Sequence, residues 1–305
     1  MKKNNDKTLT KTKEEKVFDN VRIQWYPGHM ARARREMAEV VKLVDVVVEI
    51  VDARIPISSR NPVLNEIIGN KPRVIVLNKA DLADRKQNQR WIDFYKTENV
   101  MAVEVDSCHG SGIKNVTDAI YQLMADKIEK HEQSGRVGAS IKTMVVGIPN
   151  VGKSTFINKI AGKQTTAVGN KPGVTRKNQW VRLNDKIQLL DTPGVLWPKF
   201  DNEQIARHLA YIGTIKDEIL DVDELALHLI EELIKNHKKE LYERYKISED
   251  FSYDMSYEIM DEIGRRRGCL VRGGEIDYTK VANIVLDEFR SGKIGLITLE
   301  EVERP

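Results

Sequence analysis

The chain lacks any apolar run long enough to cross a bilayer. Its longest apolar stretch, Val44–Val51, is interrupted by Asp45 and Glu49, whereas a spanning helix needs roughly 20 apolar residues. The N-terminal sequence MKKNNDKTLTKTKEEK is basic and polar, with no hydrophobic segment behind it, which argues against a secretory signal. We therefore expect a cytoplasmic protein that makes no use of a membrane.

Cysteine is scarce and a strong net charge is absent. Cys108 and Cys269 lie in dissimilar segments without CxxC spacing, so neither a disulfide nor a zinc site is expected. A net charge of +3 over 305 residues does not by itself indicate nucleic-acid binding. Two local arginine clusters are compatible with phosphate contacts or with solvated faces. Their members are Arg32, Arg34 and Arg35, and Arg265, Arg266, Arg267 and Arg272.

Short apolar runs alternate with stretches of helical spacing. Since strands of four to eight apolar residues that alternate with helices build parallel sheets covered on both faces, this pattern predicts a doubly wound α/β fold. Helices are expected over 29–43, over 113–123 and from about Gly152. The expected strands are Val44–Val51, Val74–Leu77, Val100–Val105 and Ile141–Val146, and the pair Trp180–Leu183 and Ile187–Leu190.

The pattern divides the chain into three parts. Residues 1–22 are expected to be a disordered basic tail, or else a tail that grips nucleic acid. Residues 23–200 form the α/β domain, in which the polar stretch Glu129–Ser140 is expected to be a connector. Residues 201–305 show helical spacing without strand-like alternation, as in Ala226, Leu229, Ile230 and Leu233, and predict a small all-helical domain.

A phosphate-binding motif follows the strand Ile141–Val146. The sequence Gly147-Ile-Pro-Asn-Val-Gly-Lys-Ser154 matches GxxxxGK[ST] and opens a helix, which is the context that the motif requires. Backbone N–H groups of such a loop surround phosphate oxygens at a helix N-terminus. Lys153 would contact the β- and γ-phosphates, and Ser154 would bind Mg²⁺. The residues expected at the nucleotide are Asn150, Val151, Gly152, Lys153, Ser154 and Thr155.

A second phosphate motif, Asp191-Thr-Pro-Gly194, stands at the end of the last expected strand. Asp191 would hold Mg²⁺ through water, and the Gly194 N–H would meet the γ-phosphate. Alone, DxxG is weak, because an Asp before a Pro-Gly turn is common, but its place after the phosphate loop strengthens it. Thr175 is the candidate switch threonine for Mg²⁺ and the γ-phosphate, and an ordinary loop threonine is the alternative.

The sequence Asn78-Lys79-Ala80-Asp81 indicates a guanine nucleotide. The Asp81 carboxylate can accept both the N1–H and the exocyclic N–H₂ of guanine, which adenine does not present in that arrangement. Asn78 can bond to the far side of the base, and the stem of Lys79 can lie along its face. Asp106 and Ser107, after the next strand, form the weaker fifth element, whose backbone would contact guanine O6.

The order of these motifs is unusual. The guanine motif and the serine loop precede the phosphate loop, the switch threonine and DxxG, whereas ordinary GTPases run the other way. A sheet is indifferent to where its chain begins, provided that the old termini are joined. The sequence therefore predicts a circularly permuted P-loop GTPase domain, with a mostly parallel sheet. The chain then runs from Gly194 directly into the helical domain.

The motif order, the opening Trp25-Tyr-Pro-Gly-His29-Met30, the segment Asp52-Ala-Arg54-Ile-Pro56 and the helical tail resemble the ribosome biogenesis GTPase A family of bacteria. The resemblance extends from about residue 23 to the end. It implies a cytoplasmic GTPase that binds late precursors of the large ribosomal subunit, is stimulated by them and leaves after hydrolysis. It also implies a helical domain that contacts ribosomal RNA.

Two residues depart from the pattern of signalling GTPases. Those enzymes place a water-orienting glutamine after DxxG, but here Val195 follows Gly194. The resemblance implicates His29, expected in a Pro-Gly loop, in catalysis; a helix-capping or RNA-contacting histidine is the alternative. Asn150 is a candidate K⁺ ligand beside the phosphates, as in potassium-activated GTPases, or a structural residue.

We expect a monomer with slow intrinsic GTP hydrolysis that the ribosomal particle stimulates. Two alternatives stay open: a GTPase of the same architecture in another pathway, and a nucleotide-gated RNA-binding module for which hydrolysis is incidental. The arginines expected to contact RNA are Arg32, Arg35, Arg265, Arg266, Arg267 and Arg272.

Overall fold

The structure is a computed structural model of the chain. It describes residues 27–134, 140–162, 179–192, 194, 202–248 and 255–302, and for residues 27–33 it describes the backbone alone. The expected tail 1–22 lies outside these ranges. Among the described residues, no helix has both the length and the apolar character needed to cross a bilayer.

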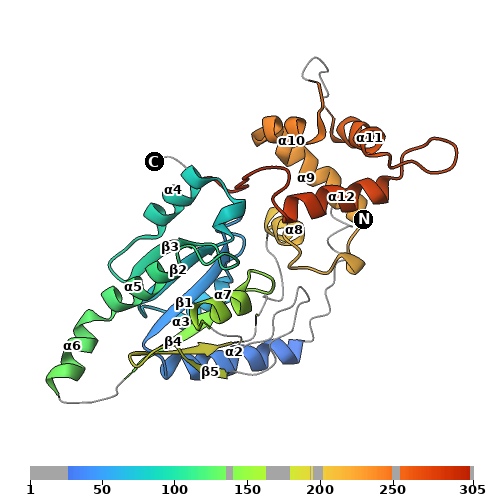
Figure 1. Ribbon diagram of the computed structural model, residues 1–305. Helices are drawn as coiled ribbons and strands as arrows, with labels where there is room; N and C mark the ends of the chain where they lie inside the picture. Colours follow the sequence, from blue (N-terminus) through green and yellow to red (C-terminus); the bar gives the residue numbers. More distant parts are fainter. Residues whose placement is uncertain are drawn as a thin grey trace, which may run out of the picture.

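The described α/β part is built on a mostly parallel, six-stranded sheet (Figure 1). The strand order is β3-β2-β1-β4-β6-β5, and β5 is antiparallel to its neighbour β6. The predicted strands and the predicted strand pair are confirmed. The strands are β1 (Val46–Asp52), β2 (Arg73–Asn78), β3 (Val100–Val105), β4 (Ile141–Val146), β5 (Gln179–Arg182) and β6 (Ile187–Asp191).

Helices cover both faces of the sheet, which explains why its strands are almost continuously apolar. Val46 and Val48 of β1 face a core that includes residues of α5 (Ile113–Leu123) and α7 (Lys153–Ile160). Val47 faces the opposite core. The helices on that side are α2 (Pro27–Lys42), α3 (Pro62–Ile68) and α4 (Arg85–Tyr95).

The expected connector Glu129–Ser140 is partly wrong. Residues 125–133 form helix α6 (Ala125–Gln133), which projects from the α/β part in Figure 1. None of its residues is buried, so it has no apolar stripe for periodicity to detect. Its i,i+4 hydrogen bond from Gln133 to Glu129, at 3.0 Å, supports an exposed helix instead.

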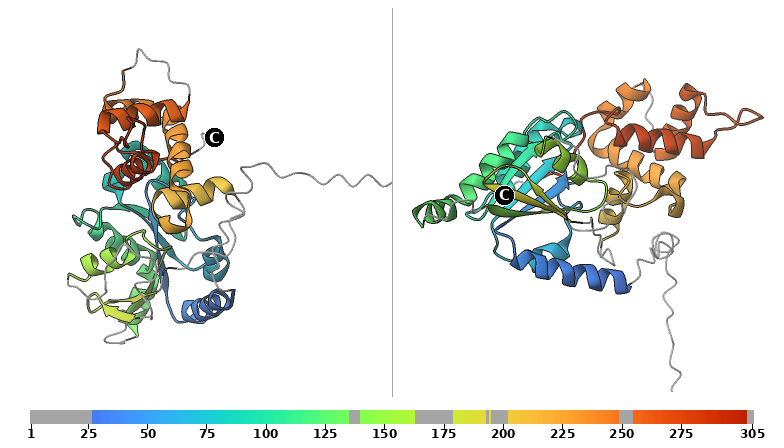
Figure 2. Two further views of the ribbon diagram at one scale, coloured as in Figure 1. Left: turned by 90° about the vertical axis from the view of Figure 1, so that its right-hand side faces the viewer. Right: turned by 60° about the horizontal axis from the view of Figure 1, so that its bottom comes forward.

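The C-terminal part is helical, as predicted. Figure 2 shows it at one end of the α/β part. Helix α9 lies at its centre and contacts each of the other four described helices. One short strand-like contact, between Leu270 and Ile276, was not expected. The helices are α8 (Glu203–Tyr211), α9 (Val222–Asn236), α10 (Lys238–Tyr245), α11 (Ser256–Arg267) and α12 (Tyr278–Arg290).

After α12 the chain returns to the α/β part, a contact that the division at residue 201 does not anticipate. The Leu299 N–H donates to the Arg54 carbonyl at 2.8 Å, and the Ile297 N–H donates to the Leu82 carbonyl at 3.1 Å. The Trp91 Nε1–H of α4 donates to the Glu300 carbonyl at 2.9 Å. These bonds fix the helical part against the α/β part.

Candidate functional site

The carboxyl ends of the parallel strands bring the predicted motifs to one edge of the sheet. β1 ends at Asp52, β2 at Asn78 and β6 at Asp191. Asp106 follows β3, and the loop from Gly147 follows β4. The strand order reverses between β1 and β4, and ligands of open α/β sheets bind at such a reversal. This edge therefore has the position expected of a nucleotide site.

The phosphate loop passes so close to its neighbours that glycine is required twice. Gly152 has φ 89°, and a Cβ there would lie 2.4 Å from Nδ2 of Asn78. A Cβ at Gly147 would lie 2.7 Å from the carbonyl oxygen of Ile50. The loop leads into the N-terminus of α7, where unpaired N–H groups and the helix dipole favour an anion.

Lys153 and Asp191 form a buried ion pair beside this loop. The Lys153 ammonium donates to Asp191 Oδ1 at 2.9 Å. Asp191 Oδ2 is buried and has no hydrogen-bond partner among the described residues. Such an oxygen is costly unless a ligand satisfies it, and Mg²⁺ and its waters would do so. With Ser154 in the first turn of α7, the donors that the structure describes fit the predicted Mg²⁺ site.

Asn78 joins three motifs through one amide. Its Nδ2 donates to the Val151 carbonyl in the phosphate loop at 2.6 Å. Its Oδ1 accepts from Ser107 Oγ at 2.6 Å and from Ser107 N at 3.3 Å. We expected the amide to be directed at the base, but one Nδ2 proton and Oδ1 are engaged within the protein. The second Nδ2 proton is the donor that this arrangement leaves for the base.

The two acidic residues of the guanine motifs have different surroundings. Partial burial and the nearby Asp106 carboxylate raise the pKa of Asp81, which lies exposed in the 3₁₀ turn Ala80–Leu82. Burial opposes ionisation of Asp106, but hydrogen bonds from His109 and Cys108 outweigh it and lower its pKa. Asp106 Oδ1 accepts from the backbone N–H groups of both residues. Asp106 therefore shapes its own loop, and Asp81 is the carboxylate accessible to a base.

Lys79 has partners that the sequence analysis missed. With φ 58°, it directs its ammonium to the Asn150 carbonyl at 2.9 Å and to Asp52 Oδ2 at 3.0 Å. Asp52 is fully buried and is also paired with Arg54 at 2.8 Å. Burial would raise the pKa of Asp52, but Arg54 and Lys79 outweigh it and hold the pKa well below its usual range. The sequence did contain a signal that Asp52 lies near the guanine motif, because Asp52 ends a buried strand and is in register with Asn78.

Asn150 contacts the helical part directly. It adopts a left-handed conformation, with φ 65°, and its Nδ2 donates to the Gly213 carbonyl that follows α8. Next to it, the Pro149 carbonyl accepts from Thr214 Oγ1 at 3.1 Å. These contacts agree with the structural role that the sequence left open for Asn150, and its Oδ1 is a different atom from the one that they use.

Several predicted residues are described only in part. Gly194 lies against the phosphate loop, since a Cβ there would be 3.1 Å from Pro149 N. His29 was expected in a Pro-Gly loop and at the start of the helix 29–43; its backbone belongs to the first turn of α2, and a proline such as Pro27 is favoured at a helix start. Outside the described residues or side chains lie Thr175 and Val195, and the side chains of His29 and Arg32.

The second arginine cluster divides by the direction of its side chains. Arg265 and Arg266, in the last turn of α11, pair with Asp261 and Glu262 of the same helix. Arg267 instead pairs with Glu288 of α12 at 3.1 Å and lies 5.3 Å from the ring centre of Tyr245. Arg267 is thus part of the packing between helices. Arg272 is exposed in the loop after α11, and Arg35 is exposed on α2.

Comparison with known proteins gives a consistent result. Residues 142–253 match a family described as 50S ribosome-binding GTPase. The Ribosome biogenesis GTPase A of Priestia megaterium is 45% identical over 287 residues, which cover 93% of this chain and 99% of that protein. The protein of the same name from Thermotoga maritima is 30% identical and covers 92% of this chain and 95% of its own length.

A solved structure is similar over most of the chain. The GNP-bound YlqF from T. maritima has a TM-score of 0.60 and 25% sequence identity. The match covers 88% of this chain and 98% of that one.

Proposed function

Because this chain belongs to the ribosome biogenesis GTPase A family, we propose that it hydrolyses GTP on late precursors of the large ribosomal subunit and promotes their maturation. The choice of the large subunit is supported by the description of the matching family, 50S ribosome-binding GTPase. The observation that carries the proposal is the meeting of the guanine motif, the serine loop and the phosphate loop at the Asn78 amide.

Hydrolysis begins with a water in line with the bond between the β- and γ-phosphates. Lys153 exchanges its bond to Asp191 for the phosphate oxygens, where its charge offsets the developing negative charge. Ser154, Thr175 and, through water, Asp191 would hold Mg²⁺, which supplies further neutralisation of the phosphates. The Gly194 N–H donates to the γ-phosphate.

We assign the positioning of the attacking water to His29. The side chain of Val195 cannot hydrogen-bond a water, and His29 belongs to the first turn of α2. Free of the particle, turnover is slow, and contact with the particle brings His29 to the attacking water. Asn150 Oδ1 is the proposed ligand for K⁺ beside the phosphates.

The particle is proposed to bind through RNA phosphates, with the protein acting as a cytoplasmic monomer. Arginine side chains with exposed guanidinium groups suit such contacts, because each releases counterions from the RNA. Arg267 would contribute through packing, since Glu288 and Tyr245 occupy its side chain. The proposed RNA contacts are Arg32, Arg35, Arg265, Arg266 and Arg272.

Sedimentation with purified large-subunit precursors tests the proposal. We expect the protein to sediment with the particle in a non-hydrolysable GTP analogue and to be released in GDP. Small subunits and a Lys153→Ala variant serve as controls for the particle and for the nucleotide. Binding to the particle that is the same in both nucleotides would instead support an RNA-binding module for which hydrolysis is incidental. No binding to the large-subunit precursor in any nucleotide would refute the proposal.

A further inference from the structure

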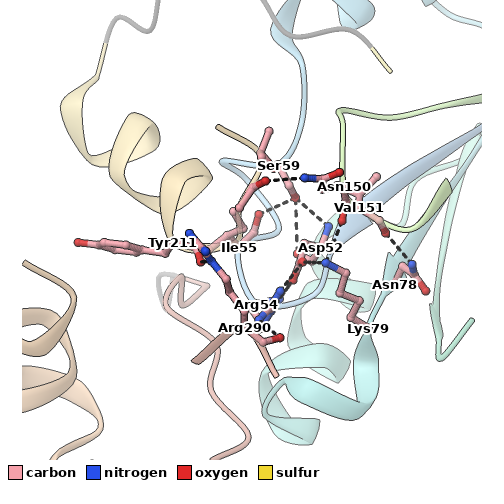
Figure 3. A network of polar contacts seen from close by, with 12 residues as sticks. Asp52, Arg54, Ile55, Ser59, Asn78, Lys79, Asn150, Val151, Tyr211 and Arg290 are labelled. Carbon is pink, nitrogen blue, oxygen red and sulfur yellow. Dashed lines mark hydrogen bonds and ion pairs between the residues drawn. The ribbon is translucent and has the colours of Figure 1, made fainter. Parts of the chain in front are cut away.

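A network of polar contacts, closed into a ring by the short backbone stretch from Tyr211 to Gly213, joins the phosphate loop and the guanine motif to the helical part (Figure 3). From the phosphate loop it runs through the guanine motif to the end of β1, then to the end of α12, to the end of α8 and back. The ring consists of Asn150, Lys79, Asp52, Arg54, Arg290, Tyr211 and Gly213.

Arg54 fixes the distance between the nucleotide motifs and α12. It is 1% exposed. Its Nε and Nη2 donate to the two carboxylate oxygens of Asp52 at 2.9 and 2.8 Å. Its Nη1 donates to the carbonyls of Phe289 and Arg290 at 3.2 Å, where the negative end of the α12 dipole favours a cation. A lysine cannot make both sets of bonds, because its ammonium is a single point of charge.

The other half of the ring runs through the two helix ends. Arg290 donates from Nε to the Tyr211 carbonyl and from Nη2 to the Ala210 carbonyl, each at 2.9 Å. It also pairs with Asp217 at 2.6 Å. Two residues beyond Tyr211, the Gly213 carbonyl accepts from Asn150. A displacement of Asn150 therefore either moves the end of α8 or breaks this bond.

The ring touches the parts of the site that GDP and GTP share. The stem of Lys79 is expected to lie along the guanine face, and Asn150 belongs to the loop expected around the phosphates. Gly194, the expected γ-phosphate contact, and Asp191, the expected partner of the Mg²⁺ waters, lie outside it. We propose that the ring couples occupancy of the guanine site, by GDP or GTP alike, to the placement of α8 and α12, with Arg54 as its positioning residue.

This coupling works alongside the expected γ-phosphate switch. Coupling between two sites is reciprocal, so a partner that moves α12 changes the retention of either nucleotide by the same factor. From the proposed function, the inference requires only that the protein binds guanine nucleotides. It does not require binding to a ribosomal particle.

Hydrogen exchange of the free protein tests the inference, with nucleotide binding measured first by calorimetry. In the wild type, saturating GDP and a non-hydrolysable GTP analogue should both slow exchange at the ends of α8 and α12. The slowing should be at least about fivefold, the lower end of common coupling factors, and equal for the two nucleotides.

Arg54→Lys should abolish this slowing although nucleotide still binds. The matched control is Arg60→Lys, because Arg60 makes the same two-point contact with a buried carboxylate, Glu49, at 3.2 and 2.9 Å, but lies outside the ring. In Arg60→Lys, both nucleotides should slow exchange at the ends of α8 and α12 as they do in the wild type. If Arg54→Lys does not fold, Arg290→Lys replaces it in the experiment, because this variant breaks the ring where Arg290 bonds to the end of α8.

Three outcomes would overturn the inference: slowing only with the GTP analogue, no slowing in a wild type that binds nucleotide, or undiminished slowing in the ring variants. None of these outcomes depends on whether the protein binds ribosomal precursors. Failure of the proposed function would appear in the sedimentation experiment and would leave the exchange result unchanged.

Discussion

The contacts of His208 predict that the folded state loses stability between neutral and alkaline pH. His208, in α8, is 1% exposed. Its Nε2 lies 2.9 Å from Glu232 of α9, and its Nδ1 lies 3.0 Å from Glu300 of the C-terminal segment. Burial would lower the pKa of His208, but hydrogen bonds and charges of the two carboxylates outweigh it and raise the pKa to about 9. The charged imidazolium therefore joins three segments.

A pKa that is raised in the folded state stabilises that state. The contribution of His208 is fully present below its ordinary pKa of 6.5, declines as the pH rises, and is lost above about 9. At about 1.4 kcal/mol for each pKa unit, it amounts to roughly 3 kcal/mol. This is a large share of the ~5–15 kcal/mol by which domains are stable.

His208→Gln tests this, because glutamine retains hydrogen bonding but cannot become charged. Urea unfolding should show the variant destabilised by roughly 3 kcal/mol near pH 6 and by little near pH 9. The control is the wild type, unfolded under the same conditions at both pH values. A free-energy difference between His208→Gln and wild type that is the same at both pH values would refute the reasoning.

Three further predictions concern the nucleotide and the particle. Asp81→Asn should lose a few kcal/mol of GTP affinity in calorimetry and gain affinity for xanthine nucleotides; normal GTP binding would contradict the guanine assignment. His29→Ala should keep GTP affinity and particle binding but lose about 10²-fold of particle-stimulated single turnover. A stimulated rate within about twofold of wild type would remove His29 from catalysis. Replacing Arg265 and Arg266 with alanine should flatten the salt dependence of particle binding without changing free GTP turnover. An unchanged slope would return both arginines to a solvated surface.

The strands and the convergence of the motifs could be predicted because one physical cause produces both. Strands buried on two faces are nearly continuous apolar runs, as in Val46–Asp52 and most of Ile141–Val146. The polar residues that end such runs must gather at one edge when the strands are parallel. The meeting of Asn78 with Val151 and Ser107 is the product of that rule.

Contacts between distant segments could not be predicted in this way. Hydrophobic periodicity reports which side of an element is buried, but not which element covers it. The bond from Arg54 to the end of α12 and the return of Glu300 to His208 therefore left no local signal. In the sequence, Arg54 stood out only because the segment Asp52–Pro56 contributes to the family resemblance. The burial of Arg54 against α12 gives this segment a structural role.

The run Arg265–Arg267 shows why a charge cluster in sequence is not yet a charged surface. All three arginines occupy the last turn of α11, where successive side chains point about 100° apart. Arg265 and Arg266 are themselves exposed and reach back to half-buried carboxylates one turn earlier on the same helix, so their guanidinium groups remain accessible to phosphate. Arg267 points to Glu288, which Arg244 also binds at 2.6 Å. Replacing all three together would therefore confound RNA affinity with helix packing, and only the first two report on the particle.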